Sequence, residues 1–470
     1  MKFKISDLWR IDGKIGRGPY LIVGLLLFAV KYNLDRIVAG VFFQRNWGIV
    51  NYWMQSDSPD IGGIPSTQVS FYAAMLATAL PFIWIGVCMT LARLRDSGLP
   101  LWMTVLFFVP LINLIFFLML GALPAECRTM DLKSIDGHLF YRSCKRWIPD
   151  SPLGSAGVGI GITLVLGGVL TCWSVEFLKN YGWGLFVGVP FCLGLFSVLI
   201  YGFHVPRSFS ACVTVSVLSV VIFGIVLLAL AMEGIICIAM AAPIAIVLAL
   251  IGGTIGWVIQ RRPALRVETP RILSVIALAI PAMMAIEKAE RPEPPLFEVK
   301  TAVVINAPPL RVWKNVVSFT DLPEPTEWVF RTGVAYPTRA EIRGKGIGAI
   351  RHCNFSTGCF IEPIEVWDEP RLLKFSVTSN PPPMKEISFY PDLHPPHLDG
   401  YLVSRRGQFH LIPLPGGRTL LEGTTWYQHG LWPVNYWRIW SDQIIHAIHQ
   451  RVLKHVKQLS EKDEAKSESS

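Results

Sequence analysis

The chain has 470 residues, of which 52% are hydrophobic and only 16% are charged. A soluble domain carries about a quarter charged residues, so this composition excludes a chain that is soluble throughout. The net charge is +9, but no basic run is interleaved with aromatic residues, and we expect no nucleic-acid partner. The apolar runs all precede about residue 288. We therefore expect a membrane-embedded part, with membrane lipids as partners, followed by a soluble part of roughly 170 residues.

Eight apolar segments are candidates for membrane-spanning helices, because about 20 apolar residues cross the hydrocarbon core. They are Pro19–Val41, Ser70–Leu91, Leu99–Leu120, Ala156–Phe177, Gly182–Phe203, Ala211–Met232, Ile235–Val258 and the shorter Ile272–Ile286. The last could instead be an interfacial or partly buried helix. The basic N-terminus lacks a clear small-residue cleavage site, so we expect no cleaved signal peptide.

The first span contains Lys31 and Asp35, an i,i+4 pair on one helix face. A self-neutralising pair is favoured over a proton or ion relay, and the middle spans carry no intramembrane charge that would indicate a transport pathway.

A charged corner, "TLARLRDSGLPLW", separates the second and third segments. Asp-Ser-Gly is typical of a turn, and arginines at a helix end can bind carbonyl groups that lack a partner. We favour a structural hairpin corner formed by Arg93, Arg95 and Asp96 over a binding site at Arg95 and Asp96.

This corner also carries a resemblance. Together with "GKIGRGPY" near the start, "ARLRDSGLPLWMTVLFFVPLINLIFFLMLGALP" resembles the bacterial inner-membrane family DUF805 over about the first 125 residues. Arg95 stands where that family commonly has His, and the second Arg of its entry motif is missing. The resemblance implies a bacterial, multi-pass inner-membrane protein and implies no activity.

The basic clusters conflict in the membrane topology that they predict. Lys and Arg mark cytoplasmic loops, which places residues 128–146, Arg207 and residues 261–271 in the cytoplasm. The basic residues 2–17 favour the same side, yet three predicted spans separate them from the first of those loops. Either one span is re-entrant or one cluster lies against the rule. We favour slightly an extracytoplasmic C-terminal domain and leave its side open.

The periodicity changes after a Pro-rich linker, residues 288–297, so we divide the chain into residues 1–125, 126–287, 298–462 and a disordered tail, 463–470. "FEVKTAVVINA" alternates like a strand and "PPLRVWKNVVSF" begins a helix at proline. Five or six antiparallel strands follow, and a long helix begins at Val434.

That order of elements resembles the helix-grip fold of the START, polyketide-cyclase and plant pathogenesis-related superfamily (SRPBCC). The matching stretches are "INAPPLRVWKNVVSF", "GKGIGAIRHCNF", "VWDEPRLLKFSV", "GGRTLLEGTTWY" and the closing helix. The resemblance implies a curved sheet around a helix, with an apolar cavity that binds lipid-like or polyketide-like molecules. An insertion, "NPPPMKEISFYPDLHPPHLDG", departs from the pattern and could act as a lid.

The candidate cavity residues come from the predicted strands and the last helix: Glu362, Arg405, Glu422, Trp426, Tyr427, Trp437 and Trp440. Alternation places Glu422 and Trp426 on one face of their strand and Tyr427 on the other. His394 and His397 have no evident third ligand, so we expect no metal and no cofactor. Cys353 and Cys359 flank a hairpin turn, and their pairing is left open.

The sequence thus predicts a multi-pass α-helical membrane domain joined to an α+β helix-grip domain that binds a hydrophobic small molecule without catalysis. Two alternatives stay open. One is a membrane-anchored enzyme of the cyclase or dehydratase type that uses a cavity carboxylate or His. The other is a scaffold that binds a protein partner.

Overall fold

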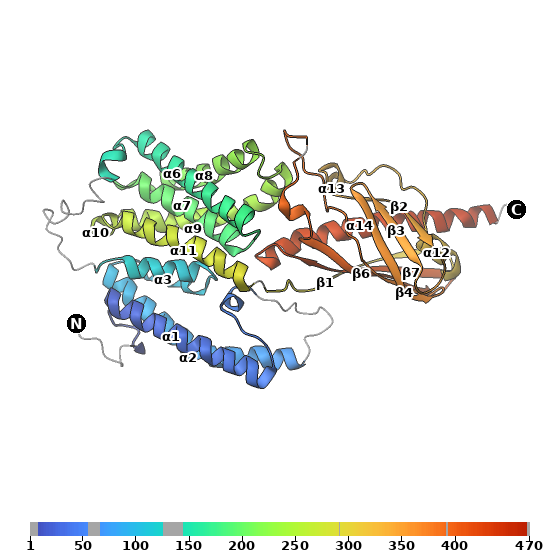
Figure 1. Ribbon diagram of the computed structural model, residues 1–470, viewed down its shortest axis with the longest axis horizontal. Helices are drawn as coiled ribbons and strands as arrows, with labels where there is room; N and C mark the ends of the chain where they lie inside the picture. The colour runs from blue at the N-terminus through green and yellow to red at the C-terminus, as the bar shows by residue number, and fades with distance from the viewer. Residues whose placement is uncertain (1–7, 55–65, 126–143, 291, 392, 468–470) are drawn as a thin grey trace. The chain divides into compact units, whose positions relative to one another are not determined.

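The computed structural model describes residues 8–54, 66–125, 144–290, 292–391 and 393–467. The chain forms two compact units, shown in Figure 1. The membrane unit contains the described residues up to 230 and those from 241 to 292. The C-terminal unit contains the described residues from 293 on and also residues 231–240, which include the start of an apolar helix.

The described residues of the membrane unit form helices joined by loops. Its α-helices are α1 (Arg17–Ile37), α2 (Ser66–Ser97), α3 (Ile112–Ala122), α6 (Pro152–Cys172), α7 (Val189–Tyr201), α8 (Phe209–Ala229), α9 (Ile235–Gln260), α10 (Pro263–Arg266) and α11 (Thr269–Glu290). Short 3-10 or π segments are η2 (Val38–Phe42), η3 (Ile49–Tyr52), η4 (Leu101–Phe108), η5 (Trp173–Phe177) and η6 (Gly184–Gly188). Among the described residues, six helices are long and apolar enough to cross a membrane: α2, α6 with η5, η6 with α7, α8, α9 and α11. The eighth predicted segment is thus a candidate span of 22 residues, Thr269–Glu290.

Helix α1 is not among those six, yet it runs antiparallel to α2 over its whole length. The Ile15 amide donates to the Ala92 carbonyl at one end, and the Phe43 and Phe71 rings are 5.1 Å apart at the other. Between them, the buried Asp35 pairs with Lys31 and accepts a 2.7 Å hydrogen bond from Tyr52. The predicted self-neutralising pair is therefore formed, and α1 packs along α2 from Ala92 to Phe71.

The third predicted span, Leu99–Leu120, is not a single helix. It is divided into η4 and the 11-residue α3, which is about 16 Å long, whereas the hydrocarbon core is about 30 Å thick. The break contains Pro110, which cannot donate a backbone hydrogen bond, and Leu111, whose φ is +63°. The prediction that this segment crosses the membrane as one helix is therefore wrong.

The contacts of Arg93 bring the two ends of the broken segment together. Its side chain is fully buried near the end of α2, pairs with Asp96, and donates to the Leu120 and Leu123 carbonyls at the end of α3. Phe107, close to the break, packs against Gly86 of α2. Gly86 lies only about 10 Å from Arg93 along the helix axis. The segment therefore descends beside α2, turns and returns to the same end.

Arg95, the other arginine of the corner, binds the Ile11 carbonyl. The corner thus ties the chain before α1 to the end of α2, in the structural role that the sequence favours over binding.

The C-terminal unit is built on one antiparallel sheet of seven strands in the order β1-β7-β6-β5-β4-β3-β2. The strands are β1 (Phe297–Ile305), β2 (Pro337–Arg343), β3 (Ile350–Phe355), β4 (Gly358–Asp368), β5 (Leu372–Ser376), β6 (Leu402–Leu414) and β7 (Arg418–His429). The helices are α12 (Pro309–Val317), α13 (Trp328–Arg331), η7 (Pro396–Leu398) and α14 (Val434–Ser467). The predicted order of strand, helix, five or six strands and long helix is confirmed, with six strands, β2 to β7, after α12.

The sheet curls along α14, as Figure 1 shows for the orange strands and the red helix, and this is a helix-grip fold. Its core contains Trp313 of α12, Leu373 and Leu421 of the sheet, and Val452 and Val456 of α14. Alternation along each strand directs one set of apolar side chains toward this helix.

The insertion, residues 380–400, packs on residues of its own unit. Met384 and Leu398 are buried with Phe330, and Ile236 and Cys237 pack against this cluster. The Ile235 amide also donates to the Ile387 carbonyl at 3.0 Å. The insertion therefore contacts the start of α9, and its role as a lid stays a prediction.

Candidate functional site

A cavity of about 110 Å³ lies between the concave face of the sheet and α14. Its apolar lining comes from Phe355, Phe360, Phe375 and Phe409 on the strands and from Ile445, Ile448, Val452 and Leu453 on the helix. The exposed Arg406 belongs to the same lining and marks a side on which it reaches the surface. The interior of the fold is therefore hollow, although the hollow is narrow.

A buried ion pair forms the polar part of this cavity. Arg351 of β3 and Glu362 of β4 are direct cross-strand partners, and their side chains are 2% and 8% exposed. The Arg351 guanidinium carbon also lies 5.5 Å from the centres of the Phe375 and Phe409 rings. Because removing two charges from water is expensive, a pair in such apolar surroundings is weak evidence for stability and suggests a function.

The hydrogen-bonding capacity of the polar groups in the cavity is not fully satisfied by the described residues. Burial raises the pKa of Glu362, and the positive charge of Arg351 opposes that rise. Burial lowers the pKa of His449 to about 4, so its ring is neutral at pH 7 and forms 2.7 and 3.0 Å hydrogen bonds with Thr425 and Thr301. Within the described residues, Arg351 Nε is buried without a hydrogen-bond partner. This donor can bind an acceptor on a ligand.

Of the seven cavity residues that the sequence suggested, the structure places Glu362 in this lining. Glu422 points to the outer face, where it pairs with Lys300 at 2.8 Å. Trp426, on the same face, donates to Glu298, and the exposed Arg405 binds Gln428 at 2.8 Å. These three side chains lie on the convex side because the sheet curls toward α14.

The other three aromatic residues lie near the beginning of α14. Tyr427 is fully buried and donates to Asp442 at 2.6 Å, which fixes the helix against β7. Trp437 is buried, and Trp440 is half-buried. Neither these two nor Tyr427 belongs to the lining of the cavity. Arg351, which sequence reasoning missed, could have been found only from its register opposite Glu362.

Cys353 and Cys359 are both free thiols. Cys353 lies opposite Phe360 in the β3–β4 ladder, whereas Cys359 lies opposite Asn354. The two thiols therefore point to opposite faces of the hairpin, and Cys353 belongs to the cavity lining.

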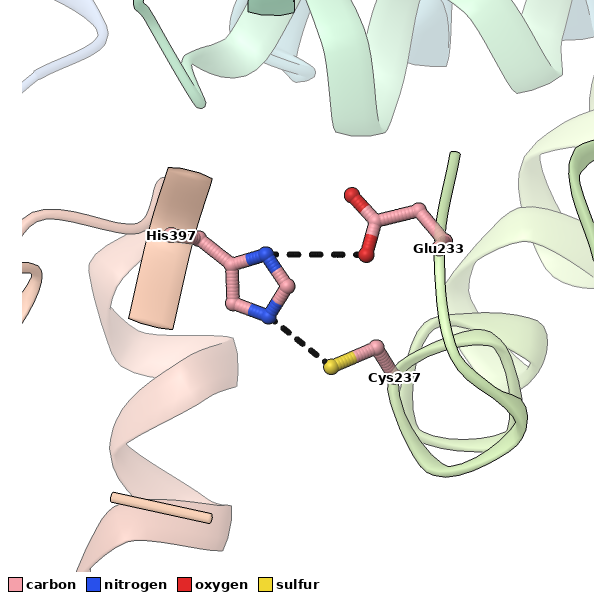
Figure 2. Close-up of side chains that lie close together, drawn as sticks. All are labelled: Glu233, Cys237 and His397. Carbon is pink, nitrogen blue, oxygen red and sulfur yellow. Dashed lines mark hydrogen bonds and ion pairs between the residues drawn. The ribbon is translucent and has the colours of Figure 1, made fainter. Parts of the chain in front are cut away.

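A second polar cluster lies in the C-terminal unit, away from the cavity lining. We call Glu233, Cys237, Glu386 and His397 the Cys237 cluster. Figure 2 shows Glu233 and Cys237 facing His397, and the Sγ atom of Cys237 lies 3.0 Å from its Nε2 atom. Cys237 Sγ also lies 2.6 Å from Glu386 Oε1. This cluster contains the residue types that bind metals, and sequence reasoning missed it because its halves are about 150 residues apart.

A family model described as a protein of unknown function, DUF805, matches residues 8–130, which confirms the resemblance of the N-terminal part. No curated protein matches the chain.

Several solved structures resemble the C-terminal part. Norcoclaurine synthase from Thalictrum flavum, in complex with dopamine and hydroxybenzaldehyde, is 14% identical, with 35% of this chain and 86% of that chain covered and a TM-score of 0.24. The Zhui aromatase/cyclase from Streptomyces sp. R1128 is 14% identical, with 35% and 94% covered and a TM-score of 0.23. A protein from Nitrosospira multiformis is 18% identical, with 34% and 94% covered and a TM-score of 0.22.

Proposed function

We propose that this chain is a bacterial inner-membrane protein whose helix-grip domain binds a small, largely apolar molecule in the cavity beside α14. The observation that carries this proposal is an aromatic cavity with a buried ion pair and an Arg351 Nε donor that has no partner in the described part of the chain. A fold that only needed stability would be served as well by apolar side chains at these positions.

The volume of the cavity limits the size of this ligand. Sites for drug-sized molecules have volumes of about 300–1,000 Å³, whereas a cavity of about 150 Å³ can enclose benzene. At about 110 Å³, this cavity suits a single ring or a short chain better than a whole lipid. A longer molecule would leave part of its length outside the domain.

The polar groups limit the chemistry of the ligand. Arg351 Nε offers a donor in apolar surroundings, and the phenylalanine rings offer surfaces for stacking. The best fit is therefore an aromatic or short-chain molecule that carries one oxygen acceptor, such as a carbonyl or phenolic group. Attachment to a membrane raises the local concentration of such a molecule when it partitions into the bilayer.

The membrane topology follows from the re-entrant segment. If Leu99–Leu120 enters and returns on one side, residues 2–17 and the basic loop 128–146 share that side, and the conflict between them disappears. Among the described residues, seven helices then remain as crossings, namely α1, α2, α6, α7, α8, α9 and α11. An odd number of crossings puts the C-terminal domain on the opposite side from the basic clusters, outside the cytoplasm.

Filling the cavity tests the binding proposal. A Cβ atom at Gly423 would lie 3.6 Å from Leu453 and 3.7 Å from Phe409, so the backbone accepts a side chain there. We expect Gly423→Val to remove a small molecule that native mass spectrometry detects on the full chain in detergent, or to weaken benzoate or phenol binding about tenfold or more.

The matched control is Glu422→Gln, the next residue, whose side chain faces outward and should leave binding unchanged. Equal binding by Gly423→Val and the unaltered chain would contradict the proposal. Absence of both a co-purified molecule and saturable benzoate or phenol binding would also contradict it.

A catalytic role for the same cavity is the second candidate. Glu362 and His449 both line it, and burial raises the pKa of the first and lowers that of the second. Such groups can accept or donate a proton to a bound carbonyl compound. If the protein is an enzyme, the Glu362→Gln variant should retain bound substrate that the unaltered chain converts. If it is a binding protein, the variant and the unaltered chain should release the same molecule.

A further inference from the structure

The Cys237 cluster joins two parts of the C-terminal unit that are distant in sequence. Glu233 and Cys237 come from residues 231–240, at the start of α9, and Glu386 and His397 come from the insertion. Three atoms form a triangle: Cys237 Sγ is 2.6 Å from Glu386 Oε1 and 3.0 Å from His397 Nε2, and those two atoms are 3.9 Å apart.

The charges of this cluster call for a cation. The Glu386 side chain is fully buried, and its Oε2 atom has no hydrogen-bond partner among the described residues. Its partners among the described residues are Cys237 and His397, and neither side chain carries a fixed positive charge. A second carboxylate, Glu233, lies 3.5 Å from the same histidine. A buried carboxylate whose partners among the described residues carry no fixed positive charge is costly, and a bound cation would compensate the charge of Glu386.

We propose that Cys237 Sγ, Glu386 and His397 Nε2 bind a zinc ion, and that Glu233 positions the histidine ring. In a tetrahedral zinc site, bond lengths of about 2.0–2.3 Å place neighbouring ligand atoms roughly 3.4–3.7 Å apart. The three distances of the triangle bracket that value, so small rotations of the side chains complete the geometry.

The two nitrogens of His397 have separate roles in this arrangement. Nε2 faces Cys237, whereas Nδ1 faces the Glu233 carboxylate, as Figure 2 shows. Nε2 also lies 3.9 Å from Glu386 Oε1. A metal-binding histidine usually donates its other N–H to a carboxylate, which fixes the tautomer and the ring.

The ligand set favours zinc and leaves one position open. Thiolate, imidazole and carboxylate are the three ligand types that proteins use for Zn²⁺, and three protein ligands leave a fourth position for water. Glu386 also lines a hollow of about 470 Å³ under the insertion, from which water can reach the site. The ion would link residues 231–240 to the insertion, two segments of the same unit.

Cobalt substitution in the full chain tests this site. The protein is purified in detergent, stripped with a chelator and titrated with Co²⁺, whose bond to a thiolate gives a near-ultraviolet charge-transfer band. We expect one equivalent of Co²⁺ with this band, displaced by one equivalent of Zn²⁺. Cys237→Ser should lose the band and weaken Zn²⁺ binding by at least about 100-fold. Cys359→Ser, a half-buried cysteine of the same domain, should behave like the unaltered chain.

A positioning role for Glu233 has its own signature. Glu233→Gln should keep the thiolate band but weaken metal binding about 10–100-fold, as loss of an orienting partner does. If Cys237→Ser does not fold, Glu386→Gln replaces it, because the amide keeps the size of the carboxylate. The proposal is overturned if the unaltered chain binds less than one equivalent of Co²⁺, or if the band persists in Cys237→Ser.

Discussion

A phosphatase that is active only after export should be active when fused after Ser470, and a fluorescent protein that folds only in the cytoplasm should be dark there. The expectation rests on seven crossings that begin in the cytoplasm. Helix α1 counts as a crossing because it lies beside α2 over its full length. A hydrogen bond from Ile15 to Ala92 marks one end, and the contact between the Phe43 and Phe71 rings marks the other. Its Lys31–Asp35 pair lowers the cost of the two charges within it.

A fusion within the chain separates the re-entrant segment from an eighth crossing. Reporters placed after Ser97 and after Leu123 should both report the cytoplasm, because Arg93 binds the Leu120 and Leu123 carbonyls at the end of α2. A reporter in the turn before α9, at residues 230–234, should report the exported side. If Leu123 reports the exported side while Ser97 does not, the segment crosses and the proposed topology fails.

The re-entrant segment shows a limit of hydropathy. Leu99–Leu120 is as apolar as a span, and composition alone cannot show that the chain reverses at Pro110 and Leu111. Pro110 and the conflict between the basic clusters were signs in the sequence, but neither showed that this segment turns back. The contact that does so, Arg93 with Leu120 and Leu123, is a tertiary one.

The helix-grip fold was predictable because each strand alternates and each turn carries Gly or Pro. The site could not be predicted in the same way, because alternation separates the two faces of a strand without showing which face the curled sheet encloses. Glu422 and Tyr427 are on opposite faces as expected, yet neither lines the cavity. The Cys237 cluster depends on contacts between Cys237 and an insertion about 150 residues away, which no local pattern reveals.

Replacement of Arg351 alone should be among the most destabilising changes in the C-terminal domain. Arg351→Met leaves Glu362 buried without its positive partner, and breaking a buried pair in this way costs about 3–5 kcal/mol. Hydrogen exchange of β3 and β4 amides in the full chain should therefore accelerate by about 10²–10⁴-fold where exchange requires unfolding of the sheet. Arg339→Met is the matched control, because its pair with Glu341 is half-exposed and should contribute at most about 1 kcal/mol.

The double variant Arg351→Met/Glu362→Leu should recover most of the stability, because two apolar side chains of similar size remove the uncompensated charge. The single variant should also regain stability as the pH falls. Burial raises the pKa of Glu362 and only Arg351 opposes it, so without the arginine the folded state takes up a proton more readily than the unfolded state. Protonation then favours folding at low pH. Equal losses in the single and double variants would mean that packing of the Arg351 side chain, rather than its charge, stabilises the sheet.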